Sequence, residues 1–170
     1  MSDYLLSDEL TELAARVVSE NAAIGRKVVT AESCTGGLVS AAITEIPGSS
    51  AVLDRAFITY SNEAKMESLG VASDIIETFG AVSIACVWAM AQGALKHSKA
   101  DVAVAISGVA GPGGGTQLKP VGTVVFARAV RNSEGEPEGE LKFFEGGDGP
   151  GGRAAIRHQA TVCALDLLLP

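Results

Sequence analysis

The stretch from Lys27 to Gly37 reads KVVTAESCTGG and decides the fold class. Its first five residues, Lys27 to Ala31, are mostly apolar and β-branched, which predicts a short strand. Ser33 and Thr35 follow in a turn that ends in two glycines, and a helix is predicted from there to about Glu45. A strand that passes through such a turn into a helix exposes its turn residues at the carboxyl edge of an α/β sheet, where ligands bind.

Strands and helices mostly alternate along the rest of the chain, which predicts a three-layer α/β domain. The first helix begins near Ser7, a good N-cap, and has apolar residues at helical spacing. The polar segment 132–139 reads as a hairpin loop, so at least one strand is expected to be antiparallel. The other predicted strands are 57–60, 102–106, 121–130 and 141–144, and the later helices are 82–96 and 154–169.

Composition bounds the function. The chain has 170 residues, 47% of them hydrophobic, which fits one domain over residues 1–170. Its 13 basic and 20 acidic residues give a net charge of −7, which argues against nucleic acid as a partner. We find no apolar run of about 18 residues and no basic segment at the N-terminus, so neither a membrane span nor a signal peptide is expected. A cytoplasmic protein fits these features.

Metal and disulfide chemistry are not expected. The three cysteines, Cys34, Cys86 and Cys163, are too scattered for a disulfide framework or a zinc site. His, Cys and carboxylate residues also lack the spacing of metal ligands. We therefore predict no metal and no cofactor.

Ser33 is a candidate nucleophile, although a serine at this turn can also be a simple helix N-cap. The two histidines, His97 and His158, have no motif that ties them to Ser33. Lys65, in the segment TYSNEAK at 59–65, is a better candidate base, and Tyr60 could relay a proton. Only about one free lysine in 2,500 is neutral at pH 7, so Lys65 would have to be buried. The alternative is an exposed Lys65 paired with neighbouring glutamates.

Cys34 is a second candidate nucleophile. A thiol at a helix N-terminus can be activated by the helix dipole. A thiolate would not need a lysine base, so this hypothesis leaves Lys65 without a role. Resistance of the activity to thiol alkylation would remove it.

Two glycine-rich segments follow buried strands. The first, SGVAGPGGGT at 107–116, lacks the ending of a P-loop, but amides from Ser107 and Gly108 onward could cradle a phosphate or ribose. It could equally be a flexible connection. The second, GDGPGG at 147–152, matches the dinucleotide fingerprint only formally, because no second strand and acidic residue follow it. Arg153, at the start of the last helix, could hold an anion or simply face solvent.

With these residues in view, the sequence resembles the C-terminal domain family of CinA proteins from about Leu10 to Leu168. The matching motifs are TAESCTGG at 30–37, PGSS at 47–50, TYSNEAK at 59–65, GAVS at 80–83, SGVAGPGGGT at 107–116 and KPVGTV at 119–124. Characterised members of the family are nicotinamide-nucleotide amidohydrolases. The chain resembles the stand-alone form of this domain.

The resemblance implies a three-layer α/β/α sandwich with a mixed, mostly parallel sheet, commonly assembled as a homodimer. It implies hydrolysis of nicotinamide mononucleotide to nicotinate mononucleotide and ammonia, with Ser33 as nucleophile, Lys65 as its partner and Tyr60 assisting. The substrate-binding positions would be Thr35, Gly36, Ser107, Gly108 and Arg153. The alternative is a nucleotide-binding or interaction module that keeps the fold without catalysis.

Overall fold

The computed structural model describes residues 3–170, so Met1 and Ser2 of the domain predicted over 1–170 lie outside the described residues. Five strands and six α-helices make up this part of the chain. The strands are β1 (Val28–Glu32), β2 (Leu53–Ile58), β3 (Val102–Gly108), β4 (Thr123–Val130) and β5 (Glu138–Phe143). The helices are α1 (Asp8–Ala23), α2 (Leu38–Thr44), α3 (Asn62–Leu69), α4 (Ser73–Phe79), α5 (Ile84–Lys96) and α6 (Gly152–Leu167), with a 3-10 turn over Ser49–Ala51.

The strands form one mixed sheet in the order β2-β1-β3-β4-β5. β1 pairs in parallel with β2 and β3, whereas β4 is antiparallel to both β3 and β5. Only β4 therefore runs against the other four strands of the described chain. The carboxyl ends of β1, β2 and β3 lie at one edge, together with the start of β4.

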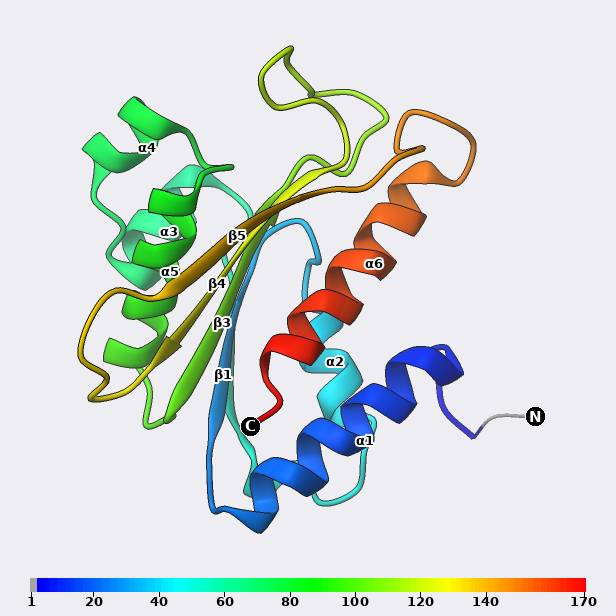
Figure 1. Ribbon diagram of the computed structural model, residues 1–170, viewed down its shortest axis with the longest axis vertical. Helices are drawn as coiled ribbons and strands as arrows, with labels where there is room; N and C mark the ends of the chain where they lie inside the picture. Colours follow the sequence, from blue (N-terminus) through cyan, green and yellow to red (C-terminus); the bar gives the residue numbers. More distant parts are fainter. Residues whose placement is uncertain (1–2) are drawn as a thin grey trace.

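Helices cover both faces of the sheet, which makes three layers (Figure 1). On one face, α1, α2 and α6 pack over a core that includes Val28, Val104 and Phe126. On the other, α3, α4 and α5 pack over alternate residues of the same strands, such as Val29 and Ala103. The inner strands are buried on both faces because successive side chains of a strand point to opposite sides. The predicted mixed α/β/α sandwich is confirmed.

Several predicted boundaries differ from the structure. β2 ends at Ile58, so Tyr60 lies beyond the strand that was predicted to contain it. β2 and β5 are edge strands with exposed charged residues. The prediction relied on runs of apolar residues, so it placed the ends of these two strands incorrectly. The seven-residue helix α4 was not predicted, because it buries no side chain completely.

Helices α3 and α5 approach each other closely at Gly93. A Cβ atom added at Gly93 of α5 would collide with the carbonyl of Leu69, at the end of α3. The atoms of Leu69 that it would meet are all backbone, so a side chain at position 93 would have to displace α3 itself. None of the helices described is long and apolar enough to cross a membrane.

Candidate active site

Ser33 lies at the carboxyl end of β1, in the turn that leads to α2. Its main-chain N–H donates to the carbonyl of Ile106 at 3.0 Å, which ties the turn to β3. Glu32 and Ser33 are consecutive, so their side chains point to opposite faces of the sheet. Ser33 faces the α3 side and is 7% exposed. The turn thus presents a hydroxyl group from a rigid, mostly buried position.

Lys65, on α3, meets Ser33 across 32 residues of sequence. Its Nζ lies 3.0 Å from Ser33 Oγ, 2.6 Å from the Thr59 carbonyl and 3.3 Å from the Tyr60 carbonyl. The residue is 1% exposed, and no ion pair to it occurs within residues 3–170. Burial disfavours the ammonium form and lowers the pKa of Lys65 below its usual value, while the neighbouring thiols of Cys86 and Cys34 oppose this shift. The arrangement favours a neutral amine beside the serine.

Glu32 is the last residue of β1 and directly precedes the nucleophile turn, residues 33–37. The sequence analysis did not predict a role for it. The side chain is completely buried and is surrounded by hydrogen-bond donors only. These donors are the hydroxyls of Thr30 and Thr35 and the main-chain amides of Gly37, Val39 and Ser40, at 2.8–3.3 Å. Gly37, the N-cap of α2, has no side chain to cap the helix, so Glu32 takes that role from five residues upstream.

Arg157, on α6, contacts the same turn from outside. Its Nε donates to the Cys34 carbonyl at 3.0 Å and its Nη2 to the Thr35 carbonyl at 3.3 Å. Gly36 leaves room for the guanidinium, since a Cβ there would lie 3.3 Å from Nη2. The Cys34 thiol itself is buried, which raises its pKa to about 11 and disfavours the thiolate that a cysteine nucleophile needs.

Tyr60 and Arg153 form a solvent-exposed pair. Arg153 Nη2 donates to the Tyr60 hydroxyl at 3.1 Å, and its Nη1 donates to the Gly111 carbonyl at 2.8 Å. Arg153 thus joins the start of α6 to both the end of β2 and the loop after β3. Tyr60 meets Lys65 only through its main-chain carbonyl, so its hydroxyl contacts neither Lys65 nor Ser33.

The other predicted binding residues make mostly internal contacts. The Thr35 hydroxyl donates to Glu32, and the Gly36 amide donates to the Ser33 carbonyl at 3.0 Å. Ser107 is 1% exposed and, by strand alternation, shares the α5 side of the sheet with Ala103 and Ala105. Gly108 leaves room for β4, since a Cβ there would lie within 3.1 Å of the Thr123 and Val124 backbone.

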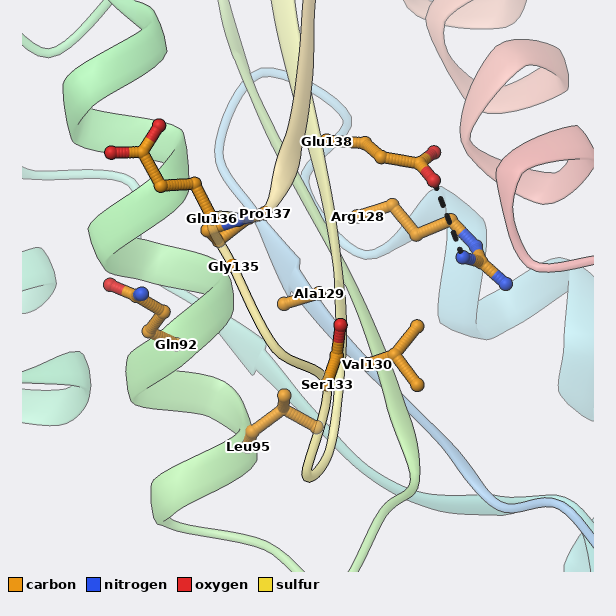
Figure 2. Close-up of a pocket in the computed structure, with 10 residues that line it drawn as sticks. All are labelled: Gln92, Leu95, Arg128, Ala129, Val130, Ser133, Gly135, Glu136, Pro137 and Glu138. Atoms are coloured by element: carbon orange, nitrogen blue, oxygen red, sulfur yellow. Dashed lines mark ion pairs between the residues drawn. The ribbon is translucent and has the colours of Figure 1, made fainter.

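Two hollows in the surface lie at opposite ends of the strands, and one of them is at the same end as Ser33. One, of about 480 Å³, lies between the loop at 112–116 and the loop at 145–148, at the same sheet edge as Ser33. The other, of about 170 Å³ and drawn in Figure 2, lies where β4 ends and β5 begins, at the opposite edge. Arg128 Nη1 and Glu138 Oε1 form an ion pair across 4.0 Å in its lining (Figure 2). In residues 3–170, no group of three or more His, Cys, Asp or Glu side chains could hold a metal ion.

Comparison with known proteins identifies the family. The sequence model of the CinA C-terminal domain matches residues 10–170, so the chain belongs to this family. Within it, the chain is 49% identical to the nicotinamide-nucleotide amidohydrolase PncC of Escherichia coli K12, over 96% of this chain and 95% of that protein. It is also 46% identical to a CinA-like protein of Akkermansia muciniphila, of which it spans 38%.

Solved structures of related proteins have the same fold. The competence/damage-inducible protein CihA of Agrobacterium tumefaciens aligns with a TM-score of 0.89 and 46% identity, over 99% of this chain and 97% of that one. A CinA superfamily protein from Klebsiella pneumoniae aligns with a TM-score of 0.85 and 40% identity, over 94% of each chain. The family and fold expected from the sequence motifs are confirmed.

Proposed function

We propose that this protein hydrolyses the carboxamide of nicotinamide mononucleotide, giving nicotinate mononucleotide and ammonia. The observation that carries the proposal is the contact of 3.0 Å between Ser33 Oγ and the buried Lys65 Nζ. The 49% identity to an amidohydrolase named for nicotinamide nucleotides supports the choice of substrate.

The surroundings of Lys65 suit proton transfer. A neutral amine has two N–H groups and one lone pair. The carbonyls of Thr59 and Tyr60 accept the two N–H groups, which leaves the lone pair for the Ser33 hydroxyl. After transfer, all three N–H groups of the ammonium still have acceptors. The proton therefore moves without rearrangement of the site, and Tyr60 assists through its carbonyl.

The reaction proceeds in two stages. Ser33 Oγ loses its proton to Lys65 and attacks the carboxamide carbon, and main-chain amides of the turn hold the resulting oxyanion. The C–N bond then breaks, ammonia leaves with the proton from Lys65, and an ester to Ser33 remains. Water attacks this ester with Lys65 again accepting a proton, which Lys65 returns to Ser33 Oγ as the ester bond breaks, and the carboxylic acid released loses its own proton to solvent. Lys65 carries the proton of each attacking hydroxyl group to its leaving group, and the scheme uses no metal.

The rest of the substrate fits the same sheet edge. Arg153 is an exposed cation that contacts the Tyr60 hydroxyl, and an anionic phosphate would suit its guanidinium. The hollow between the loops at 112–116 and 145–148 has only Glu145 and Asp148 as charged lining residues, so it suits a ribose better than a phosphate. We assign Ser107, Gly108, Thr35 and Gly36 to shaping the walls of the site.

Release of ammonia from nicotinamide mononucleotide tests the proposal, with Ser33→Ala and Lys65→Met measured beside the unsubstituted protein. We expect turnover that each substitution lowers roughly 10³-fold or more, because the two groups act as a unit. Chelating agents should leave turnover unchanged. Binding of the mononucleotide without ammonia release would instead favour the nucleotide-binding module, and full activity of Ser33→Ala would exclude the serine mechanism.

We also propose that the protein acts in the cytoplasm as a homodimer joined through β5. Reducing conditions suit its three free cysteines. β5 is an edge strand whose Leu141 and Phe143 are more than half exposed. Antiparallel pairing of two β5 strands about Leu141 would set Glu140 of each chain opposite Lys142 of the other.

A further inference from the structure

The nucleophile turn contains two main-chain amides that donate to no other residue of the described part of the chain. The amide of Ser33 donates to Ile106, that of Gly36 to Ser33, and that of Gly37 to Glu32. The amides of Cys34 and Thr35 have no such acceptor among the described residues. Thr35 is fully enclosed, whereas Cys34 keeps 5% of its surface exposed beside Ser33, so the Cys34 amide is the donor that an acceptor arriving with the substrate can reach. Glu32 already occupies three N-terminal amides of α2, which removes them from this role.

Both of these amides are linked to the guanidinium of Arg157 through peptide groups. Arg157 Nη2 donates to the Thr35 carbonyl, whose peptide carries the Gly36 N–H. That N–H donates to the Ser33 carbonyl, whose peptide carries the Cys34 N–H. A second, shorter path runs from Arg157 Nε to the Cys34 carbonyl, whose peptide carries the Thr35 N–H.

Such a chain has a physical consequence. In a trans peptide, the carbonyl and the N–H point in opposite directions, so hydrogen bonds through successive peptides align head to tail. A charged donor at one end polarises each peptide in turn and strengthens the last N–H as a donor. The chain also fixes the planes of the peptides, and with them the directions of the free amides.

We propose that Arg157 is a positioning residue for the oxyanion. It would act through the peptides of the turn to aim and polarise the amide of Cys34, which holds the charge that develops on the carboxamide oxygen. The inference rests on the proposed function for its substrate. It gives Arg157 a role distinct from that of Arg153, which lies one turn earlier on α6 and contacts the exposed Tyr60.

Arg157→Ala tests the inference, with Arg131→Ala as its matched control. Arg131 also holds main-chain carbonyls, those of Leu95, Ser98 and Ala100, but it follows the end of β4 at the opposite edge of the sheet. We expect Arg157→Ala to lower kcat on nicotinamide mononucleotide roughly 30-fold, with KM little changed, because removal of an oxyanion donor costs about 10²–10³ and this effect is indirect. Arg131→Ala should lower thermal stability and leave kcat within about twofold.

Two further readouts separate positioning from a merely structural role. Sulfur is a weak acceptor, so the thionicotinamide analogue of the substrate should gain little from the amides, and Arg157→Ala should lower its kcat far less. Added guanidinium ion should restore part of the kcat of Arg157→Ala and none of that of Ser33→Ala. Equal losses on both substrates without rescue, or an unchanged kcat, would overturn the inference.

Phosphonylation of Ser33 by a fluorophosphonate probe makes the test independent of the natural substrate. If the unsubstituted protein reacts with the probe but not with the mononucleotide, the proposed function fails, and slower labelling of Arg157→Ala still supports the inference. If the unsubstituted protein turns over the mononucleotide and Arg157→Ala matches it in both reactions, only the inference fails. Absence of both reactions in the unsubstituted protein would overturn the serine nucleophile and this inference together.

Discussion

At the scale of single residues, the chemistry depends on the burial of Lys65. Because burial lowers the pKa of Lys65, the neutral amine forms below the pH range of an exposed lysine. We expect kcat/KM to rise with pH as Lys65 loses its proton, and to level off at a lower pH than the usual pKa of lysine, 10.5. A pH–rate profile of the free enzyme measures this directly. A profile that kept rising up to the usual pKa of lysine would contradict a desolvated base.

The same shift predicts a pH-dependent stability. The folded state holds the Lys65 proton less tightly than the unfolded chain, so the unfolded chain binds more protons between the two pKa values. The free energy of unfolding should therefore gain a favourable contribution as pH rises through that window, which ends near 10.5. Urea unfolding of the protein and of Lys65→Met at several pH values checks this. The free energy of unfolding of the unsubstituted protein should rise relative to that of Lys65→Met across that window. A constant difference would mean that Lys65 titrates normally.

Cys34 should be dispensable for catalysis. Its thiol is 5% exposed and its pKa is raised to about 11, so it stays protonated at neutral pH. We expect Cys34→Ala to keep most of the activity, and iodoacetamide to leave turnover intact while it labels the half-buried Cys163. Mass spectrometry of the labelled protein identifies the modified thiol. Loss of activity in step with labelling of Cys34 would revive the cysteine nucleophile.

Sequence reasoning reached Ser33 and Lys65 but not the geometry around them. Their residue types and positions after two strands indicated a pair, whereas the choice between a buried and an exposed Lys65 needed the packing of α3 on the sheet. The contacts of Tyr60 were beyond reach for the same reason. Its carbonyl accepts from Lys65, whereas its hydroxyl accepts from Arg153. Which group contacts which residue depends on the folded backbone and could not be read from the sequence.

At the scale of elements, Glu32 joins β1 to α2. Its buried carboxylate accepts five hydrogen bonds, so Glu32→Ala would leave three buried and two part-buried donors unpaired. We expect a loss of about 3 kcal/mol or more in the free energy of unfolding. Urea unfolding measures it, with Glu45→Ala as a control, since Glu45 accepts one exposed bond from Leu5. A loss in Glu32→Ala as small as in the control would refute this role.

A signal for Glu32 was present in the sequence. The helix after the turn is preceded by two glycines and has no Ser, Thr, Asp or Asn at its N-cap, so its amides needed another acceptor. The strand β1 was the only buried element that carried a carboxylate nearby. What could not be predicted is Arg157, because its contacts join the turn to a helix more than 120 residues later.

At the scale of the whole molecule, charge on β5 should control assembly. If two copies pair about Leu141, Lys142→Glu sets Glu140 against a second glutamate and should give a monomer. The double variant Glu140→Lys/Lys142→Glu restores opposite charges and should give a dimer again. Light scattering after gel filtration measures the mass, with Glu12→Lys on α1 as a control. If the measured mass is the same for all of these variants, any interface between copies lies elsewhere on the molecule.

The close approach at Gly93 has a consequence for the genetics of this protein. Position 93 lies on α5 and contributes nothing to the site, yet the carbonyl it touches ends the helix that carries Lys65. A methyl group there would shift α3 and spoil the alignment of its amine. A random screen for inactive alleles should therefore recover Gly93→Ala among its hits, as a temperature-sensitive mutant with an intact set of catalytic side chains.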